Sequence, residues 1–246
     1  MRNEEGRTFW MTWSLIPALG AAAVRAARRL LPAGSAGWDA GRRGEIPAGI
    51  LAALRREIRT RELEAVVERE WRSAERIGCS VLTLADDNYP RLLREIPDPP
   101  PVLYCLGDLR PEDDLALAVV GARQASHYGL QAAAWIAADL AAAGLTIVSG
   151  LARGIDTEAH RGALGSGGRT VGILGSGLRQ IYPPENRRLC ESICRQGAIL
   201  SPYPLDAAPL PRNFPERNRV LSGMTLGTVV VEAGERSGSL ITARLA

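Results

Sequence analysis

The sequence predicts an α/β protein with a mostly parallel sheet that carries helices on both faces, preceded by a small all-helical domain. From Leu117 onward, short β-rich runs alternate with helical runs, which is the pattern of right-handed βαβ crossovers in a parallel sheet. Residues 1–80, by contrast, have a residue pattern that predicts helices. Apolar residues make up 46% of the 246 residues, enough for one large domain or two smaller ones.

The helical domain is predicted to cover residues 1–80. A first helix near Trp10 breaks at 17–20, and a second helical run covers 24–31. After a stretch that contains glycine and proline, a strongly charged helix is expected at 50–77, because its apolar residues keep helical spacing among arginines and glutamates.

A connector is predicted for residues 81–111. Pro90, Pro97 and the three prolines at 99–101 exclude a helix interior there, because proline lacks the N–H that a helix needs.

The sheet domain is predicted to cover residues 112–246. Its β-rich runs are rich in valine, isoleucine and leucine, and the runs between them have helical character. The predicted strands are 116–120, 146–149, 170–174, 198–200 and 228–232. The predicted helices are 131–143, 157–164, 185–195 and 218–224.

A loop rich in glycine, serine and arginine follows four of these strands. The carboxyl ends of parallel strands lie at one edge of a sheet, so the loops are expected to converge where open α/β sheets bind ligands. Glycines allow close approach of the backbone, and the following helix N-termini offer unpaired N–H groups. Since Arg123 and Arg153 add full charges, we expect a phosphate or a chain of phosphates to bind there, although a single glycine turn is often only structural. The loops are 121–123, 149–156, 175–177 and 232–239.

Residue types exclude several classes of enzyme. The chain has no lysine, so all 30 basic residues are arginine, which rules out a Walker-type lysine, a Schiff-base lysine and a PLP anchor. The GxxxxGK[ST] and GxSxG motifs are absent, and a dinucleotide fingerprint is broken because Gln180 stands at the third glycine position. Codon bias is an alternative origin of the arginines, but in either case arginine, backbone amides or helix ends must hold any anion.

The segment 209–220 favours nucleic acid as the ligand. It places Arg212, Arg217 and Arg219 around Phe214. Arginines bind a phosphate backbone and an aromatic ring can stack on a base, although this phenylalanine could equally cover the edge of the core.

Metal, cofactor and membrane are not expected as partners. None of the four cysteines forms a CxxC pair and the chain has two histidines, so we expect reduced, buried thiols of a cytoplasmic protein. No apolar run approaches the roughly 20 residues of a membrane span.

An acid–base site is the alternative interpretation of this sheet edge. Asp156 and His160 lie about one helical turn apart, and Glu232 ends a predicted strand. Such groups more often cap helices and order loops. The rival function is a nucleoside-monophosphate phosphoribohydrolase of the lysine-decarboxylase-like family, since 223–232 faintly resembles its glycine-rich strand entry, although the expected proline and paired glycines are absent. A dinucleotide dehydrogenase is disfavoured by the broken fingerprint.

Six ordered blocks resemble the DNA-processing protein A family, also called DprA or Smf. They cover about 130 residues, and the sequence Asp87-Asn-Tyr-Pro90 and the N-terminal helices resemble that family more loosely. The blocks are 119–123, 149–156 with Ala159 and His160, 174–177, 181–186, 213–219 and 231–244.

The resemblance implies an extended Rossmann-like domain, which binds DNA, behind a helical domain of the sterile-alpha-motif type. It also implies a non-catalytic protein that binds and protects single-stranded DNA during natural transformation and loads the RecA recombinase onto it. Members are typically homodimers. The family's next strand and its optional winged-helix domain would lie beyond Ala246. The resemblance therefore does not decide whether this chain dimerises or contacts RecA.

The resemblance also implies which residues contact DNA. Arg123 is expected to grip a phosphate with two hydrogen bonds while neighbouring amides complete the site. Two positions depart from the family pattern, Ala122 where serine is usual and Ser201-Pro202 where Ser-Glu is usual. The net charge of +3 is small for a nucleic-acid binder, so the sequence predicts that arginines gather at this edge while the balancing carboxylates lie mainly elsewhere, many of them on the helix at 50–77. The expected DNA-binding residues are Gly121, Arg123, Ser149, Gly150, Arg153, Gly175, Ser176, Gly177, Asn213, Phe214, Arg217 and Arg219.

Overall fold

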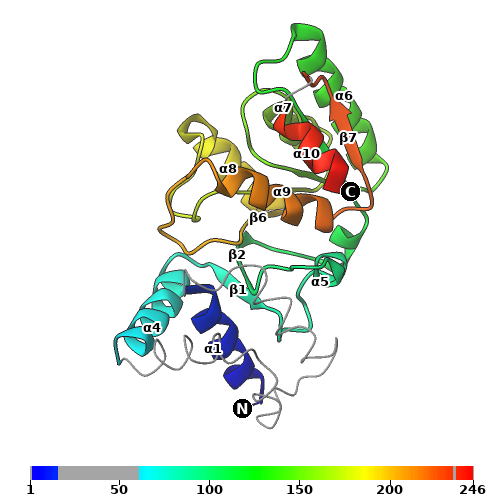
Figure 1. Ribbon diagram of the computed structural model, residues 1–246. Coiled ribbons are helices and arrows are strands. Elements are labelled where there is room, and N and C mark those ends of the chain that lie inside the picture. The colour runs from blue at the N-terminus through cyan, green and yellow to red at the C-terminus, as the bar shows by residue number, and fades with distance from the viewer. Residues whose placement is uncertain (1, 16–60, 235–236, 246) are drawn as a thin grey trace.

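The computed structural model describes residues 2–15, 61–234 and 237–245 (Figure 1). The predicted helix at 24–31 and the first part of the predicted helix at 50–77 lie outside the described residues. One seven-stranded sheet has the order β1-β2-β6-β5-β4-β3-β7. Its strands are β1 (Ser80–Thr83), β2 (Val102–Gly107), β3 (Ala116–Gly121), β4 (Thr146–Ser149), β5 (Thr170–Ile173), β6 (Ala198–Ser201) and β7 (Thr228–Val231).

The described helices surround this sheet (Figure 1). They are α1 (Arg2–Leu15), α4 (Arg61–Arg76), α5 (Arg91–Glu95), α6 (His127–Ala142), α7 (Ile155–Gly165), α8 (Arg187–Gln196), α9 (Asn213–Gly223) and α10 (Gly238–Leu245). Two short 3₁₀ helices, η2 (Pro111–Asp114) and η3 (Pro184–Asn186), lie in the connections.

The predicted α/β class is confirmed, and the five predicted strands form the parallel part of the sheet. β6, β5, β4, β3 and β7 pair in parallel, with boundaries close to the predicted ones. The largest difference is α9, which begins at Asn213 rather than near 218. Pro215 lies in the first turn of this helix, where a missing N–H costs no intrahelical hydrogen bond.

The range 81–111, predicted as a connector without a helix interior, contributes to the sheet and also contains the short helix α5, which begins directly after Pro90 and ends before Pro97. β2 pairs antiparallel with both β1 and β6, so the sheet is mixed. The run Val102-Leu-Tyr-Cys-Leu-Gly107 has strand composition, but the prolines on its N-terminal side favour an irregular connection. The strand forms because β6 offers a free edge, which is a long-range effect.

Apolar side chains on opposite faces of the sheet build two layers of core. On one face, α6 and α7 pack on β3 and β4 through alanines such as Ala133 and Ala137, whose small size permits close helix approach. On the other face, α5 and α9 pack on strand residues such as Leu200. The neighbouring Ile199 points to the first face, as the two-residue period of a strand requires.

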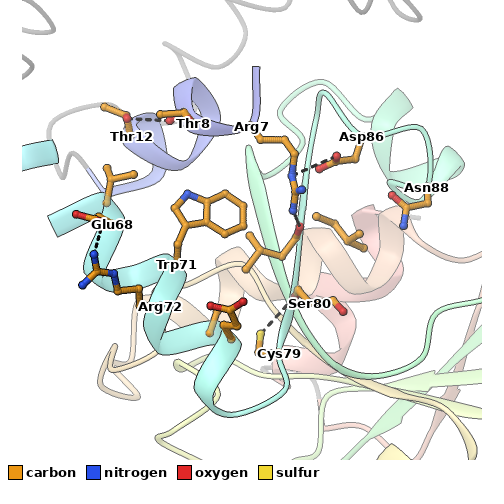
Figure 2. A pocket seen from close by; sticks show the side chains of 15 residues that line it. Arg7, Thr8, Thr12, Glu68, Trp71, Arg72, Cys79, Ser80, Asp86 and Asn88 are labelled. Carbon is orange, nitrogen blue, oxygen red and sulfur yellow. Dashed lines mark hydrogen bonds and ion pairs between the residues drawn. The ribbon is translucent and has the colours of Figure 1, made fainter. Parts of the chain in front are cut away.

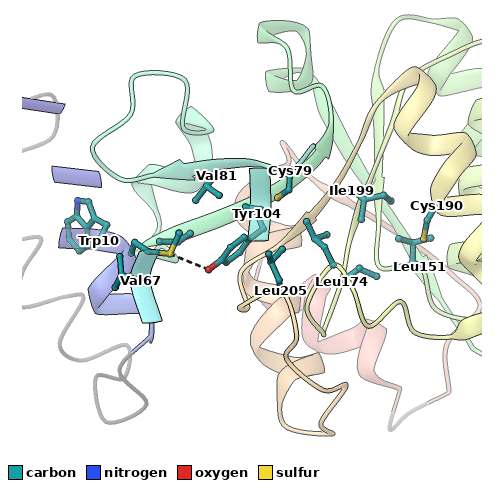
Figure 3. Close-up of a cluster of buried hydrophobic side chains, with 14 of the residues drawn as sticks. Trp10, Val67, Cys79, Val81, Tyr104, Leu151, Leu174, Cys190, Ile199 and Leu205 are labelled. Carbon is teal, nitrogen blue, oxygen red and sulfur yellow. Dashed lines mark hydrogen bonds between the residues drawn. The ribbon is translucent and has the colours of Figure 1, made fainter. Parts of the chain in front are cut away.

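The described N-terminal helices extend the core of the first face. Trp10, Met11 and Trp13 of α1 are buried with Tyr104 of β2 and with residues beneath α8 (Figure 3). The Tyr104 hydroxyl donates to the Met11 sulfur at 3.3 Å. These helices therefore pack directly on the sheet edge formed by β1 and β2.

The four cysteines are unpaired in the structure; Cys79, Cys105 and Cys190 are buried and Cys194 is half-buried. Burial raises the pKa of Cys79 to about 11 and the pKa values of Cys105 and Cys190 to about 12, which keeps these thiols protonated near neutral pH. Among the described residues, no group of three or more metal-ligating side chains occurs. No helix in that part of the chain is long and apolar enough to span a membrane.

Candidate functional site

The order of the strands creates a crevice at the carboxyl edge of the parallel sheet. After β3 the chain enters α6 on one face, whereas after β7 it enters α10, which packs on α9 of the other face. Such a switch point leaves room for a ligand between the two connections. A crevice of about 600 Å³ lies there, lined by residues that include Gly121, Arg123, Phe214 and Ser239.

Two arginines and two aromatic rings form an exposed cluster beside this crevice. The Arg123 guanidinium carbon lies 5.3 Å from the centre of the Phe214 ring, and that of Arg153 lies 6.0 Å from the Tyr182 ring. The two rings meet edge to face, with centroids 5.8 Å apart. Both arginines are exposed and both rings are half-buried. We call Arg123, Arg153, Tyr182 and Phe214 the arginine–aromatic cluster.

Arg217, expected to contact DNA, is buried beneath this cluster with 4% of its surface exposed. Its Nη1 donates to the carbonyl oxygens of Gly150 and Ile173, which end two neighbouring strands, and its Nε donates to Asn218. Burial lowers the pKa of Arg217, while the nearby Asp156 carboxylate opposes this shift. The guanidinium therefore ties α9 to the strand ends.

Asp156 accepts hydrogen bonds from two backbone amides of the loop after β4, one of which belongs to Gly150, an expected DNA-binding residue. Its Oδ2 accepts hydrogen bonds from the N–H groups of Gly150 and Ala152, at 3.1 and 3.3 Å. Burial raises the pKa of Asp156, and Arg217 and these amides oppose the shift. These loop amides are thus already engaged by the carboxyl group of the chain itself.

Other polar side chains of the expected DNA-binding set have internal partners. Ser149 donates to the Val119 carbonyl, Ser176 to the Gln180 carbonyl, and Asn213 to the carbonyls of Gly175 and Ala208. All three side chains are buried. They hold the loops in place.

The glycine turn after β5 is covered by other parts of the chain. The Phe214 ring packs against Gly175, and the backbone at Pro204 and Leu205 packs against Gly177. A side chain at either glycine would meet these atoms, which explains the two glycines as sites of close approach.

Two acidic residues pair with arginines of the expected set. Glu185 forms an ion pair with the exposed Arg153. Asp98 forms an ion pair with Arg219, which lines neither the crevice nor the adjoining hollow at Arg153. The structure thus brings Arg123, Arg153 and Phe214 together and leaves Arg219 apart from them.

Tyr182 is the functional candidate that residue-by-residue reasoning from the sequence missed. It lies within the block 181–186, whose match to the family was noted, and its ring lines both the crevice and the hollow beside Arg153. An aromatic residue in a matched block next to prolines was the available signal.

Backbone strain is concentrated in the loops of this edge. Leu151 and Glu232 have φ angles of 58° and 54°, a region that side chains other than glycine rarely adopt. Glu232 accepts hydrogen bonds from the backbone N–H and the hydroxyl of Ser126, the N-cap of α6. These strained positions point to a functional edge.

His160, considered above as an acid–base candidate, is fully buried. Its Nδ1 lies 2.7 Å from the Thr170 hydroxyl, which itself donates to the Ile147 carbonyl. The hydroxyl therefore accepts a hydrogen bond from Nδ1–H. Burial, followed by the charge of Arg217, lowers the pKa of His160 to about 3.

The buried His160 predicts a loss of stability in acid. The unfolded chain protonates this imidazole near pH 6.5 and the folded chain only near pH 3. Between these values the unfolded state binds more protons, so the free energy of unfolding falls by up to about 1.4 kcal/mol per pH unit as the pH decreases. Urea titrations of the wild type and His160→Gln between pH 4 and 8 should show a shallower decline in the variant. If the free energy of unfolding changed with pH equally in the wild type and in His160→Gln, the lowered pKa of His160 would be wrong.

A second cavity, of about 860 Å³, lies between α1, α4 and β1 (Figure 2). Arg7 crosses it, pairing with Asp86 at 3.4 Å, donating to the Val81 carbonyl and lying over the Trp71 ring. None of the expected DNA-binding residues lines this cavity.

The fold and the crevice define a Rossmann-like α/β protein with glycines and arginines at the carboxyl edge of its sheet. The sequence model of the family described as DNA recombination-mediator protein A matches residues 80–246. The chain therefore belongs to this family.

Curated relatives agree with this assignment. Protein Smf of Synechocystis sp. is 47% identical over 169 residues, which cover 67% of this chain and 42% of the relative. Protein Smf of Escherichia coli is 47% identical over 159 residues, covering 64% and 42%. DNA processing protein DprA of Bacillus subtilis is 33% identical over 215 residues, covering 84% and 72%. The chain spans less than half the length of the first two relatives.

Solved structures share the architecture. DNA processing protein A of Streptococcus pneumoniae superposes with a TM-score of 0.72 and 31% identity, covering 99% of this chain and 82% of that one. The protein from Helicobacter pylori, whose structure concerns its single-stranded DNA binding mode, superposes with a TM-score of 0.62 and 35% identity, covering 68% and 75%.

Proposed function

We propose that this chain binds single-stranded DNA at the carboxyl edge of its sheet and acts as a recombination mediator. The observation that carries this proposal is the arginine–aromatic cluster, which presents two exposed guanidinium groups beside the crevice. Arginine binds phosphate oxygens through paired N–H groups. Family membership and the single-stranded DNA binding of the Helicobacter pylori protein support the same ligand.

The expected site residues then divide into two roles. Arg123 and Arg153 contact phosphates, with Phe214 and the backbone at Gly121 and Gly150 beside them. The remaining residues fix the loops that carry this surface, and Arg219 with its Asp98 partner lies at the margin. The supporting residues are Ser149, Gly175, Ser176, Gly177, Asn213 and Arg217.

Loading of RecA, protection of incoming DNA in natural transformation and homodimerisation are further parts of the proposal. They rest on membership of the family alone. They concern the whole protein, and this chain spans less than half of its first curated relatives.

The proposed role is non-catalytic. The three acid–base candidates have structural engagements: Asp156 with loop amides, His160 with Thr170, and Glu232 with the N-cap of α6. A phosphoribohydrolase would need such groups free to reach a nucleotide.

Titration of a labelled oligothymidylate at several salt concentrations tests the proposal. Arg123→Gln should weaken binding about tenfold or more and reduce the slope of log affinity against log salt by about 0.7, the share of one phosphate on a single strand. Arg161→Gln is the matched control, because it removes the same charge from an exposed arginine that pairs with Glu158 on α7. Equal affinity of wild type and Arg123→Gln contradicts the site, and release of base from a nucleoside monophosphate favours the hydrolase.

The ion pair of Arg153 predicts a variant that binds more tightly. Glu185 shares the Arg153 guanidinium with any incoming phosphate. Glu185→Gln removes this competition and one repulsive charge, so we expect affinity for oligothymidylate to rise about two- to fivefold at low salt. Glu158→Gln, which frees Arg161 in the same way, should leave affinity unchanged. Weaker binding by Glu185→Gln would show that the pair orients Arg153 instead.

A further inference from the structure

Glu232 joins the two connections that border the crevice at the switch point. It directly follows β7, which lies beside α6 (Figure 1), and its hydrogen bonds reach the loop 122–126 between β3 and α6. The Glu232 carbonyl accepts from the Ala122 N–H at 2.8 Å, at the start of that loop. Its carboxylate accepts from the Ser126 N–H at 2.9 Å and from the Ser126 hydroxyl at 2.6 Å, at the end of the loop. One residue therefore holds both ends of the segment that carries Arg123.

The start of α7 holds the same loop along its length. The Ile155 N–H donates to the Ala122 carbonyl at 3.2 Å. Gly154, with a φ of 74°, lies so close that a Cβ on it would overlap the carbonyl oxygens of Ala122 and Arg123. The loop backbone is thus packed between α7 and Glu232, and the Arg123 side chain extends from it to the surface.

Two features show that position 232 accommodates a long acceptor side chain at a cost. Glu232 has a φ of 54°, a conformation that glycine or asparagine adopts more readily than glutamate. Opposite it, Gly129 in the first turn of α6 leaves space for the carboxylate, because a Cβ on Gly129 would overlap Glu232 Oε2. The hydrogen bond from the Ser126 hydroxyl lowers the pKa of Glu232, so the side chain is charged near neutral pH. Strain kept where glycine would relieve it points to a role beyond stability.

We propose, resting on the function proposed above, that Glu232 is a positioning residue for Arg123. It fixes the loop from which Arg123 reaches a phosphate of single-stranded DNA and does not itself contact the DNA. A loop that is ordered before the ligand arrives loses less conformational freedom on binding. This gain offsets the cost of placing a negative charge beside a site for phosphate.

The variants Glu232→Gln and Glu232→Asn form a matched pair that tests this role. Both remove the charge and end in an amide, but only glutamine is long enough to reach Ser126, and asparagine tolerates the left-handed backbone. Glu232→Gln should bind oligothymidylate within about twofold of the wild type, whereas Glu232→Asn should bind about three- to tenfold more weakly. The salt slopes should stay equal, because Arg123 still supplies its phosphate contact. Glu191→Asn, which changes an exposed carboxylate on α8, is the control and should keep the full affinity.

Gly129→Ala displaces the Glu232 side chain from the opposite direction. The added methyl group occupies the place of the carboxylate, while the charge of Glu232 is kept and alanine favours the helix. This variant should lose as much affinity as Glu232→Asn, and the two changes together should lose little more than either alone. Urea unfolding of each variant verifies that the fold is intact, so a loss of affinity is not a loss of folded protein.

Coupling to Arg123 separates positioning from a general structural role. If Glu232 acts through Arg123, the ratio of affinities between Glu232→Gln and Glu232→Asn should fall below about twofold when Arg123→Gln is also present. A general weakening of the sheet edge would give the same ratio with Arg123 and with glutamine at that position.

The outcomes distinguish this inference from the function on which it rests. Weaker binding by Glu232→Asn and Gly129→Ala, with coupling to Arg123, supports it. Equal affinities of Glu232→Gln and Glu232→Asn overturn it, and an equal gain in both would show that Glu232 only repels phosphate. In these cases the wild type still binds oligothymidylate and the proposed function stands. Failure of the wild type to bind overturns the proposed function as well.

Discussion

Replacing Arg217 with methionine is expected to lower the free energy of unfolding by about 3–5 kcal/mol. The substitution leaves the Gly150 and Ile173 carbonyls without their donor and removes the positive charge beside the buried Asp156. An unpaired carboxylate in the interior and unsatisfied carbonyls each cost more than a lost surface contact. Urea unfolding monitored by circular dichroism measures the change.

Two further variants test whether the loss of stability comes from the buried position of Arg217. Arg161→Met removes an exposed arginine of α7 and should change stability by no more than about 0.5 kcal/mol. Combining Arg217→Met with Asp156→Leu should recover part of the loss, because no buried charge then remains unpaired. If Arg217→Met were fully stable but bound DNA weakly, the residue would be a DNA contact and its structural role would be wrong.

The double variant Arg123→Gln, Arg153→Gln is expected to bind single-stranded DNA about 100-fold or more weakly than the wild type. Each arginine supplies a charge-assisted contact of about 1.5–3 kcal/mol, so two of them account for the loss. The salt slope should fall by about 1.4, the share of two phosphates on a single strand. Both side chains are exposed, so stability should change little.

A second double variant, which replaces two exposed arginines away from the crevice, is the control. Arg161→Gln, Arg195→Gln removes the same charge from the C-terminal halves of α7 and α8. These halves lie toward the opposite edge of the sheet, because crossover helices run antiparallel to the strands. The control should keep nearly the whole affinity. Comparable losses in both double variants would mean that net charge, and not the carboxyl edge, holds the DNA.

The sequence predicts the parallel strands and their convergent loops because these depend on local patterns. The β-rich runs and the glycines after them suffice, since strand direction places the loops at one edge. The antiparallel β2 was not predictable in this way. Its run at 102–107 follows several prolines, and only pairing with β6 makes it a strand.

The block 213–219 does not by itself show which of its arginines face solvent, because this depends on which face of the helix each one occupies. Arg217 and Arg219 look equivalent in the block 213–219, yet only Arg217 shares the buried face of α9 with Asn213 and Val220. A spacing of three and four residues from buried neighbours is the signal that would have marked Arg217 as internal. The partners Asp98 and Glu185 come from distant segments and could not be assigned before the fold was known.

Hydrogen–deuterium exchange of the protein with and without saturating oligothymidylate tests the central claim most directly, because it locates the DNA on the chain. Binding at the carboxyl edge predicts slower exchange at 121–126, 150–155 and 180–186, with no change on the outer face of α6. Unchanged exchange in these three segments, together with protection on α1, α4 or α6, would contradict the account.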